Sequence, residues 1–447
     1  MQLTIEKLIY GGDGLARLHS DQPGGEVDSR GKTVFLPFVL AGERVEASLI
    51  SEKPGFARAE LQRIIDPSPH RVQPACPYFA ACGGCNYQQA SYEHQLEIKE
   101  KILRETLRRT AKIELDGEIQ IHPSPPWNYR NRSRLQVHAG PPFAVGYHKT
   151  GSHELQSVEE CPISSPLINR AIASLWRKGR SGAMPNGVSE IEFFANADDI
   201  QLLVELSCEE DARRKDVRAL AESLISEMPE IVGVVAFRNA DRGMQSAERF
   251  LSVGCDHLIY QTKAGSFRVT AGSFFQTNRF LIDRLVEIVT SEQSGELALD
   301  LYAGVGLFST GLSDMRHIVS VESSQTSSTD LSYNLASKGE AIQASTEQYL
   351  ARTLNSGRVG TGAVLPHISY MPDLAVVDPP RSGLGERVVR LLAKLGAPRV
   401  TYVSCDPATM ARDLVPLLAS GYHIEETHLV DLFPQTYHLE TVIKLLR

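Results

Sequence analysis

Short apolar segments separated by glycine turns dominate the first 66 residues. These segments have the length and alternation of β-strands, and turns such as Gly11–Gly14 separate them. They cover residues 3–8, 33–38, 44–50 and 56–61. Several short strands at this spacing are typical of a small barrel, so we expect residues 1–66 to form one.

A helix and a second β-rich region follow. Apolar residues recur at helical spacing between Ser91 and Lys112, which predicts an amphipathic helix. Its basic residues alternate with glutamates, which favours a solvated face over a phosphate-binding one. These basic residues are Lys99, Lys101, Arg104, Arg108 and Arg109. Strand-like runs at 188–194 and 200–206 predict a β-rich central domain. We assign to it residues 67–90 and 113–262.

Strand-like runs in the C-terminal part of the chain alternate with helical segments. They lie at residues 297–302, 318–322, 374–377 and 400–403. Such alternation builds a parallel, Rossmann-like sheet, whose ligand crevice lies at the carboxyl ends of its strands. We therefore expect an α/β domain made of residues 91–112 and 263–447.

Cys405 is the candidate nucleophile of this domain. It follows the last of these strands and precedes a helix that Asp406 or Thr409 can cap. A thiol at that position faces the crevice, together with Asp378 from the preceding strand. We expect the helix N-terminus to lower the pKa of the thiol. The plain alternative is a small buried residue, as most unpaired cysteines are.

A glycine turn after the first strand of the domain predicts a cofactor site. Gly304 and Gly306 let the backbone approach a ligand, and Glu322 ends the next strand with a carboxylate suited to ribose hydroxyls. Ser309 occupies the third glycine position of a dinucleotide fingerprint, which disfavours NAD.

Length, charge and hydropathy limit the class of protein. The 447 residues suggest several domains, and the 42% hydrophobic content suggests globular folding. No apolar run approaches the roughly 20 residues that span a bilayer, and no signal peptide is visible, so we expect a cytoplasmic protein. A net charge of −8 means that any contact with RNA must be local.

The densest group of arginines and aromatic residues lies between Trp127 and Leu135. Arginine offers bidentate phosphate contacts, and aromatic rings stack on unpaired bases. Arg130, Arg132 and Arg134 are the candidate RNA contacts, because strand alternation directs all three to one face. Structural ion pairing is the alternative.

Seven cysteines in a reducing compartment favour a metal or catalytic role over disulfides. Cys76, Cys82 and Cys85 lie within ten residues, with two glycines that let the chain bend around a metal. Cys161, which also precedes a proline, is the best fourth ligand. Four thiolates bind zinc or an iron–sulfur cluster. We expect Cys208 and Cys255 to be inert core residues.

Several of these segments resemble the uracil-C5 RNA methyltransferases. The resemblance runs from the first residues to the last. The segments that carry it are the Cys405 turn, Asp378-Pro-Pro-Arg381-Ser-Gly383, Phe274-Phe-Gln-Thr-Asn278 and His438-Leu-Glu440. It implies a class I S-adenosylmethionine methyltransferase domain, an N-terminal OB-like barrel of the TRAM type that binds RNA, and a 4Fe-4S cluster on the four cysteines. Zinc remains the alternative at that site.

The resemblance also assigns roles to individual residues. Cys405 would add to C6 of the uracil, Glu440 would remove the C5 proton, and Asp378 would contact the uracil or the methyl donor. The implied donor pocket comprises Gln276, Tyr302, Gly304, Leu307, Glu322 and Asp378. The family commonly has asparagine at the position of Leu307. The amide contact of that asparagine would therefore have to come from another residue, for example near Ser345.

The expected substrate is RNA. The combination of barrel, cysteine cluster and catalytic domain resembles the 23S rRNA branch of the family, and a methyltransferase of the tRNA T-loop is the alternative. An inactive iron–sulfur protein that binds RNA is a third interpretation, against which the presence of Cys405, Asp378 and Glu440 argues. We expect a monomer without membrane contact.

Overall fold

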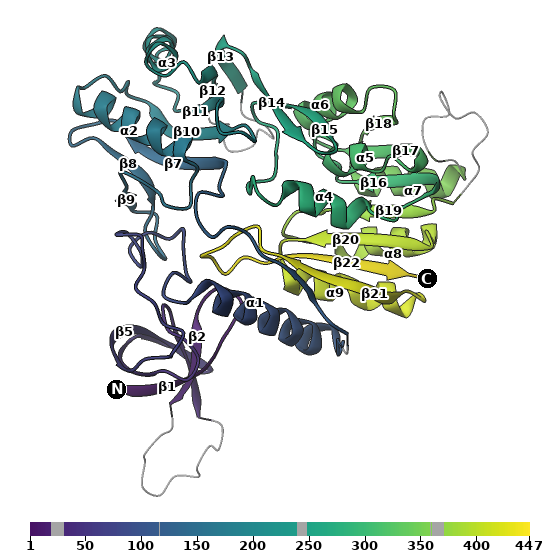
Figure 1. The fold of residues 1–447 in the computed structure, drawn as a ribbon, viewed down its shortest axis with the longest axis horizontal. Coiled ribbons are helices and arrows are strands. Elements are labelled where there is room, and N and C mark those ends of the chain that lie inside the picture. Colours follow the sequence, from purple (N-terminus) through teal and green to yellow (C-terminus); the bar gives the residue numbers. More distant parts are fainter. Residues whose placement is uncertain (19–30, 116, 239–247, 358, 360–370) are drawn as a thin grey trace, which may run out of the picture.

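The computed structural model describes residues 1–18, 31–115, 117–238, 248–357, 359 and 371–447. The described strands form a closed barrel, a seven-stranded sheet, a two-stranded hairpin and an eight-stranded sheet. The barrel, the central sheet and the C-terminal sheet occupy three separate parts of the molecule (Figure 1).

The N-terminal barrel has five strands. They are β1 (Gln2–Leu8), β2 (Gly14–Leu18), β3 (Lys32–Leu36), β4 (Arg44–Glu52) and β5 (Phe56–Asp66). Their order, β1-β2-β3-β5-β4, closes on itself. Alternate side chains such as Leu3, Ile5 and Val45 fill the interior because successive residues of a strand point to opposite faces. The barrel predicted from the sequence is confirmed.

The central sheet has the order β13-β12-β11-β10-β7-β8-β9. Its strands are β7 (Arg132–His138), β8 (Ala144–His148), β9 (Leu155–Ser157), β10 (Val188–Ala195), β11 (Leu202–Cys208), β12 (Ile231–Arg238) and β13 (Glu248–Gly254). The helices α2 (Pro166–Arg180) and α3 (Arg214–Glu227) pack their apolar sides on it. Cys208 is buried in this core as expected, but Cys255 is exposed, because it follows β13 in a turn that leaves the core.

The C-terminal sheet has the order β18-β17-β16-β19-β20-β22-β21-β6. Its strands are β16 (Gly295–Leu301), β17 (Met315–Glu322), β18 (Glu340–Gln343), β19 (Leu374–Val377), β20 (Arg399–Ser404), β21 (His423–Val430), β22 (Glu440–Leu446) and β6 (Gln120–His122). The strands from β18 to β20 are parallel, and β22 runs antiparallel to its neighbours. The chain moves outward in opposite directions from β16, which places a crevice at the carboxyl ends of β16 and β19.

Helices cover this sheet. They are α4 (Ile282–Thr290), α5 (Leu307–Gly311), α6 (Gln325–Leu335), α7 (Thr346–Ser356), α8 (Gly385–Leu395) and α9 (Pro407–Ala419). The predicted N-terminal helix is confirmed as α1 (Tyr92–Thr106), which continues into the π-helical turn η1 (Leu107–Ala111). Ile98, Ile102 and Leu103 of α1 belong to the same apolar core as the strands β16 and β19.

Two expected domain boundaries differ from the arrangement of the strands. Residues Gln120–His122 form the edge strand β6 of the C-terminal sheet, although they were assigned to the central domain. The boundary at residue 262 cuts the hairpin of β14 (His257–Thr262) and β15 (Gly265–Thr270). Both hairpin strands contribute to the core that contains α4 and β16. The partner of β6 is the distant strand β21, whereas β14 and β15 pair with each other and are placed by the core that they share with α4 and β16.

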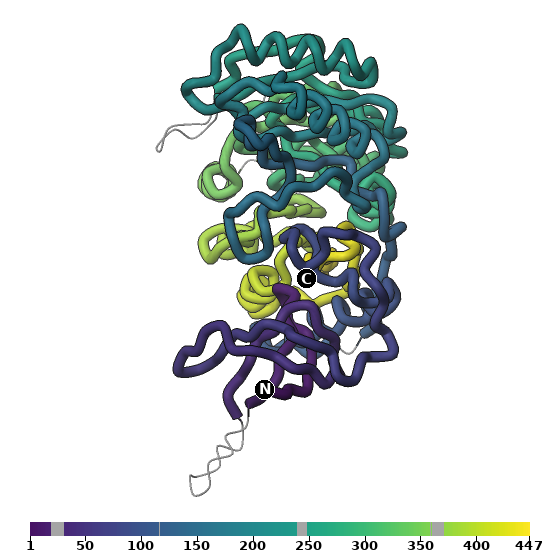
Figure 2. Tube along the Cα trace, turned by 90° about the vertical axis from the view of Figure 1, so that its left-hand side faces the viewer, coloured from purple at the N-terminus to yellow at the C-terminus, as the bar shows by residue number. Residues whose placement is uncertain are grey.

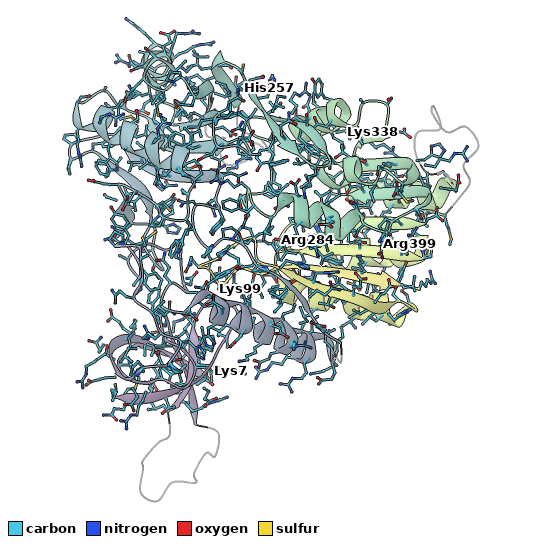
Figure 3. The ribbon with its side chains drawn as sticks, in the orientation of Figure 1. Lys7, Lys99, His257, Arg284, Lys338 and Arg399 are labelled. Carbon is cyan, nitrogen blue, oxygen red and sulfur yellow. The ribbon has the colours of Figure 1, made fainter. Side chains whose placement is uncertain are left out.

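The barrel, the C-terminal strands and the central sheet follow one another along the molecule, as the second view shows (Figure 2). Lys7 of β1 and Glu105 of α1 form an ion pair that joins the barrel to the helix (Figure 3). No helix of the described residues is long and apolar enough to cross a membrane.

Candidate active site

Cys405 lies in the turn that joins β20 to α9. The Asp406 carboxylate accepts hydrogen bonds from the backbone N–H groups of Ala408 and Thr409, at 3.0 and 2.9 Å, so Asp406 is the cap of the helix. The hydroxyl of Ser404 accepts a hydrogen bond from the Asp406 N–H at 3.2 Å. These bonds hold the turn, and the Cys405 side chain remains partly exposed.

Glu440 and Asp378 come to the same sheet edge from two other strands. Ser404 pairs with Thr441 across the antiparallel strands β20 and β22, so Glu440 begins its strand beside Cys405. Asp378 directly follows β19, the parallel neighbour of β20. Glu440 is only 4% exposed. A carboxyl group is rarely buried to this degree unless it is paired or has a function. The three predicted catalytic residues therefore lie together.

The electrostatics of the Cys405 thiol differ from the sequence-based expectation. Burial, and then the nearby carboxyl groups of Glu440 and Asp378, raise the pKa of the Cys405 thiol to about 12. The expected lowering by the helix N-terminus is wrong for the free protein, because desolvation and two acids outweigh the helix dipole. The free protein thus holds this group as a neutral thiol.

Both carboxyl groups are also shifted towards their neutral forms. Burial and the nearby Asp300 raise the pKa of Asp378 to about 7. Burial and Asp378 raise the pKa of Glu440 well above its usual range, against the opposing effect of Arg381. Pairs of ionisable groups with mutually shifted pKa values are typical of catalytic sites.

Arg381 is a functional residue that the sequence interpretation missed. Its positive charge lowers the pKa of both Cys405 and Glu440, so it lies within electrostatic reach of the two groups. The side chain is exposed, and within the described ranges of the chain it forms no ion pair. An unpaired guanidinium beside a thiol and two acids can stabilise a developing negative charge. Its place directly after the two prolines that follow Asp378 was the available signal.

The glycine turn after β16 is shaped for the close approach of a ligand. Tyr302, Gly304 and Gly306 all have positive φ, at 65°, 55° and 94°. A Cβ added to Gly304 would meet no atom within 4 Å, whereas one on Gly306 would lie 2.9 Å from Leu331. The absence of a side chain at Gly306 therefore leaves room for Leu331, whereas Gly304 borders open space.

Glu322 closes this turn from the end of β17. Its carboxylate accepts hydrogen bonds from the backbone N–H groups of Gly304 and Ser324, at 3.0 and 2.6 Å. A carboxylate has about four lone-pair sites, so acceptor capacity remains for hydroxyl groups of a ligand. Turn and acid form one hydrogen-bonded unit.

Asp300 is a second residue that was missed. It is fully buried at the end of β16, and its Oδ2 accepts a hydrogen bond from the Ser309 hydroxyl, while Oδ1 has no hydrogen-bond partner in the part of the chain that the structure describes. Burial raises the pKa of Asp300 to about 6. Because strand ends in a parallel sheet face the crevice, an acid in this strand was a recognisable signal.

Two further positions bear on the donor pocket. The Leu307 side chain packs in the apolar core with Val305 and Phe308, so it offers no polar contact. Ser345 accepts a hydrogen bond from the Gln348 N–H and caps α7. The hydroxyl proposed to replace the missing amide is therefore already engaged as a helix cap.

Gln276 lies in the loop between β15 and α4, and its side chain is 7% exposed. The loop is anchored on two sides: the Ser273 hydroxyl donates to Asp330 of α6 at 2.8 Å, and the Asn278 amide donates to the Leu432 carbonyl at 3.1 Å. These anchors connect the helix after Glu322 with the segment that leads to Glu440.

Residues 91–447 match the protein-family model described as tRNA (Uracil-5-)-methyltransferase. The chain belongs to this family. It is an S-adenosylmethionine-dependent RNA (uracil-5-)-methyltransferase. The family that the motifs resembled is confirmed, and the interpretation as an inactive RNA-binding protein is set aside.

Relatives resemble this methyltransferase over its full length. An uncharacterized RNA methyltransferase of Aquifex aeolicus is 32% identical, covering 100% of this chain and 98% of that protein. The 23S rRNA (uracil(1939)-C(5))-methyltransferase RlmD of Halomonas elongata is 30% identical, over 99% and 89%. The crystal structure of Pyrococcus abyssi tRNA (uracil-54, C5)-methyltransferase has a TM-score of 0.74 at 23% identity and covers 100% of both chains, which shows a shared fold.

The four cysteines of the methyltransferase that were expected to bind metal converge on one cavity. The cavity measures about 260 Å³ and is lined by Cys76, Cys82, Cys85 and Cys161. Burial, and then the neighbouring Cys161 thiol, raise the pKa of Cys82 to about 11. Among the described residues, no group of three His, Cys, Asp or Glu side chains is arranged to hold a single metal ion. His438 also borders this cavity, two residues from Glu440.

The three candidate RNA-binding arginines of the methyltransferase have different environments. Arg132 is 11% exposed, pairs with Glu192 and Glu205, and donates to a backbone carbonyl at 2.6 Å. Arg134 pairs with Glu192 at 2.8 Å but is 57% exposed. Arg130 donates from Nε to the Arg132 carbonyl at 2.9 Å and borders the cysteine cavity. For Arg132, the contacts are thus those of a structural ion pair, which was the alternative to RNA binding.

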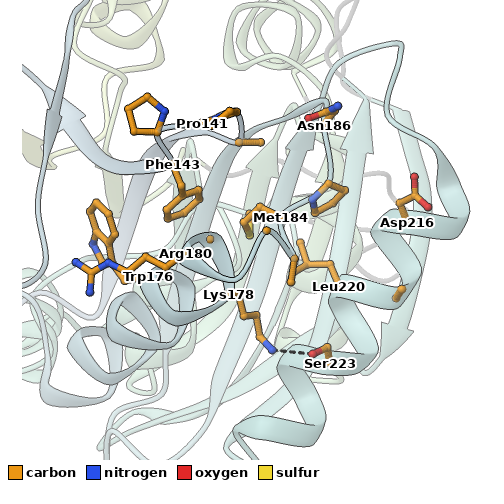
Figure 4. A pocket seen from close by; sticks show the side chains of 18 of the residues that line it. Pro141, Phe143, Trp176, Lys178, Arg180, Met184, Asn186, Asp216, Leu220 and Ser223 are labelled. Carbon is orange, nitrogen blue, oxygen red and sulfur yellow. Dashed lines mark hydrogen bonds between the residues drawn. The ribbon is translucent and has the colours of Figure 1, made fainter.

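A cavity of about 1260 Å³ lies elsewhere, in the central domain (Figure 4). Phe143, Trp176 and Met184 line it, and Lys178 donates to the Ser223 hydroxyl at 2.6 Å on its wall. None of its lining residues belongs to the catalytic group, the glycine turn or the cysteine site. The chemistry of the methyltransferase is therefore not located there.

Proposed function

We propose that the enzyme methylates C5 of a uridine through a transient bond between Cys405 Sγ and C6 of the base. The meeting of one thiol and two carboxyl groups at a single sheet edge carries this proposal. Cys405 and Asp378 follow neighbouring parallel strands, and Glu440 begins the antiparallel strand beside the cysteine. A nucleophile with a separate acid–base group within reach is what covalent catalysis requires.

Uracil C5 becomes a nucleophile only when electrons are pushed into the ring. Addition of the Cys405 thiolate forms the Sγ–C6 bond and turns the C5–C6 double bond into an enolate. Bound S-adenosylmethionine would supply an electrophilic methyl group: C5 bonds to this carbon as the methyl–sulfur bond breaks, and S-adenosyl-L-homocysteine is the leaving group. Glu440, which must be ionised at this stage although burial raises its pKa in the free protein, takes the C5 proton, the double bond returns, and Sγ leaves as a thiolate.

The protonation states of the free protein suggest how these steps are controlled. With a thiol pKa of about 12, Cys405 carries its proton until substrate arrives. Arg381 stabilises the thiolate and the enolate by charge. Asp378, with a pKa of about 7, can present a neutral carboxyl that donates a hydrogen bond to the uracil edge or to the donor.

We assign the methyl-donor pocket to the crevice between β16 and β19. Its residues are Gln276, Tyr302, Gly304, Leu307, Glu322 and Asp378. The open space at Gly304 and the carboxylate of Glu322 support this assignment. Leu307 would contribute its backbone and apolar surface. The Pyrococcus abyssi protein of the same fold was crystallised in complex with S-adenosyl-L-homocysteine.

We further assign a 4Fe-4S cluster to Cys76, Cys82, Cys85 and Cys161, with zinc as the alternative. The four thiols all line one cavity of about 260 Å³, which supports a shared metal site. Thr436 and His438 also line the cavity, so a cluster would support the segment before Glu440. Its role there is structural.

The RNA substrate that we favour is 23S rRNA, with the tRNA T-loop as the alternative. The 30% identity to the Halomonas elongata enzyme over nearly the whole chain supports the former. The barrel, Arg130 and Arg134 are the proposed RNA contacts, in a cytoplasmic monomer. Mapping of 5-methyluridine in total RNA from cells with and without the gene decides between the substrates.

A pair of variants tests the covalent mechanism. Cys405→Ala should abolish both methylation and any covalent RNA adduct. Glu440→Gln should still add the thiol and transfer the methyl group, and then stall, giving a slow band on a denaturing gel that carries label from the methyl donor. Normal turnover by Glu440→Gln would mean that another group is the base.

A further inference from the structure

The N-terminal barrel touches the catalytic turn directly. Tyr10 lies in the turn between β1 and β2, and its hydroxyl donates a hydrogen bond to the backbone carbonyl of Cys405 at 3.3 Å. The two residues are 395 positions apart in the chain. A residue of the barrel thus bonds the peptide group of the proposed nucleophile.

The Tyr10 ring also contacts the segment that carries the proposed base. It packs edge-on against Tyr437, with ring centroids 5.5 Å apart and an interplanar angle of 89°. Tyr437 in turn packs on His438, with centroids 4.3 Å apart. Because Tyr437 lies three residues before Glu440, one tyrosine contacts both the nucleophile turn and the approach to the base.

The turn that carries Tyr10 is held in a single geometry. The Ile9 N–H donates to the Asp13 carbonyl at 2.9 Å, and the Gly12 N–H donates to the Ile9 carbonyl at 3.1 Å. Gly12 has a φ of 93°, and a Cβ there would lie 3.1 Å from Asn86 and 3.5 Å from Tyr437. A turn so constrained on both sides can hold the tyrosine at a defined distance from the site.

Tyr10 remains a hydrogen-bond donor throughout the working pH range. Burial, and then the nearby Asp406, Tyr437 and Cys405, raise the pKa of the Tyr10 phenol far above neutrality. Arg381 opposes this shift. The phenol therefore keeps its proton and can donate it in the hydrogen bond to the Cys405 carbonyl.

We propose that Tyr10 is a positioning residue, through which the barrel fixes the Cys405 turn relative to the Tyr437–Glu440 segment. The proposal rests on the proposed function, in which Cys405 is the nucleophile and Glu440 is the base. The barrel is then part of the active site in addition to any role in binding RNA. A displaced turn would slow addition at C6 without changing the affinity for RNA.

The test compares Tyr10→Phe with Tyr422→Phe. The Tyr422 hydroxyl donates to the Ala397 carbonyl at 2.7 Å in the same domain as Cys405, so the control also loses one hydroxyl–carbonyl bond. Tyr10→Phe should lower kcat about tenfold with KM for RNA and the melting temperature unchanged. It should slow adduct formation equally in the Glu440→Gln background. Tyr422→Phe should change neither rate.

Three outcomes would overturn the proposal. They are wild-type kinetics for Tyr10→Phe, a change confined to KM, and an equal loss of kcat in Tyr422→Phe. Cys405→Ala, measured in parallel, separates this failure from that of the mechanism. An active Cys405→Ala would remove the covalent mechanism and the positioning role together, whereas an inactive one beside a normal Tyr10→Phe would remove the positioning role alone.

Discussion

Lys99 and Asp431 form an ion pair in which neither side chain is exposed to solvent, with Nζ and Oδ1 2.5 Å apart. Lys99 lies on α1, where the sequence predicted a solvated face, and it also donates to the Phe433 carbonyl at 2.9 Å. Tyr92 of the same helix donates to Asp431 at 2.9 Å. Lys99 lies beside the C-terminal segment (Figure 3), so α1 anchors the chain that leads to Glu440.

Breaking this pair should destabilise the protein strongly. Lys99→Met leaves the Asp431 carboxylate buried and uncompensated, which should lower the free energy of unfolding by about 3–5 kcal/mol. The double variant Lys99→Met, Asp431→Leu should regain most of this stability, because no charge is then buried. Urea unfolding measures both. Equal stability of Lys99→Met and the parent would contradict the account.

Arg381 should control the rate of covalent addition through the thiol pKa. In the Glu440→Gln background, adduct formation should rise with pH from 6 to 9, because burial and Asp378 still hold the pKa of the Cys405 thiol above its usual range. Arg381→Ala removes a charge that lowers this pKa, so the rate at neutral pH should fall about tenfold. Arg381→Lys should retain most of it. Arg390→Ala, which removes an exposed arginine paired with Glu386, is the control and should have no effect.

Ionisation of the Asp378 carboxyl group should lower the free energy of unfolding at neutral and alkaline pH. Its folded pKa of about 7 lies above that of an unfolded chain, about 3.9, so the folded state binds the proton more tightly and stability falls as the pH rises between these values. Asp378→Asn should therefore be more stable than the parent at pH 8, by about 4 kcal/mol, and nearly equal to it near pH 4. Its methylation activity should fall. A stability difference that does not depend on pH would exclude the linkage.

The cysteine site should give a visible signature. Protein purified without oxygen should be brown, because iron ligated by four thiolates absorbs broadly in the visible range. Cys82→Ser should lower the iron content and the folding yield, since metal binding contributes to the folding free energy. Cys255→Ser, which changes an exposed cysteine away from the cavity, should keep both. Colourless protein with stoichiometric zinc would replace the cluster by zinc.

Variants of Arg132 and Arg134 should have different effects, one on stability and the other on RNA binding. Arg134→Ala should weaken RNA binding and reduce its salt dependence by about one unit of slope, because its guanidinium, although paired with Glu192, is 57% exposed and can also meet a phosphate. Arg132→Ala should instead lower the unfolding temperature, because the buried Glu205 loses its ion pair and the buried Glu192 keeps only Arg134. Filter binding at several salt concentrations, with thermal unfolding in parallel, distinguishes the two. The same change in both variants would remove the distinction.

Local sequence determined the elements and the chemistry that they carry. Alternating apolar residues predicted the barrel, and strand–turn–helix patterns placed Cys405, Asp378 and Glu322 at strand ends, because side-chain period and turn residues are properties of neighbouring positions. The helix over Ser91–Lys112 followed from spacing in the same way. Cys76, Cys82 and Cys85 predicted a metal site through their spacing alone.

Only the tertiary structure decided the environments of these groups. The order of strands in the C-terminal sheet brings Glu440 and Asp378 beside Cys405, and the resulting burial and acid neighbours raise the thiol pKa that the helix alone would lower. Lys99 is buried in an ion pair with Asp431, which lies 332 positions further along the chain, so the local pattern of α1 could not reveal this partner. Charge and desolvation depend on whatever packs within a few ångströms, and such neighbours come from distant strands that no local pattern specifies.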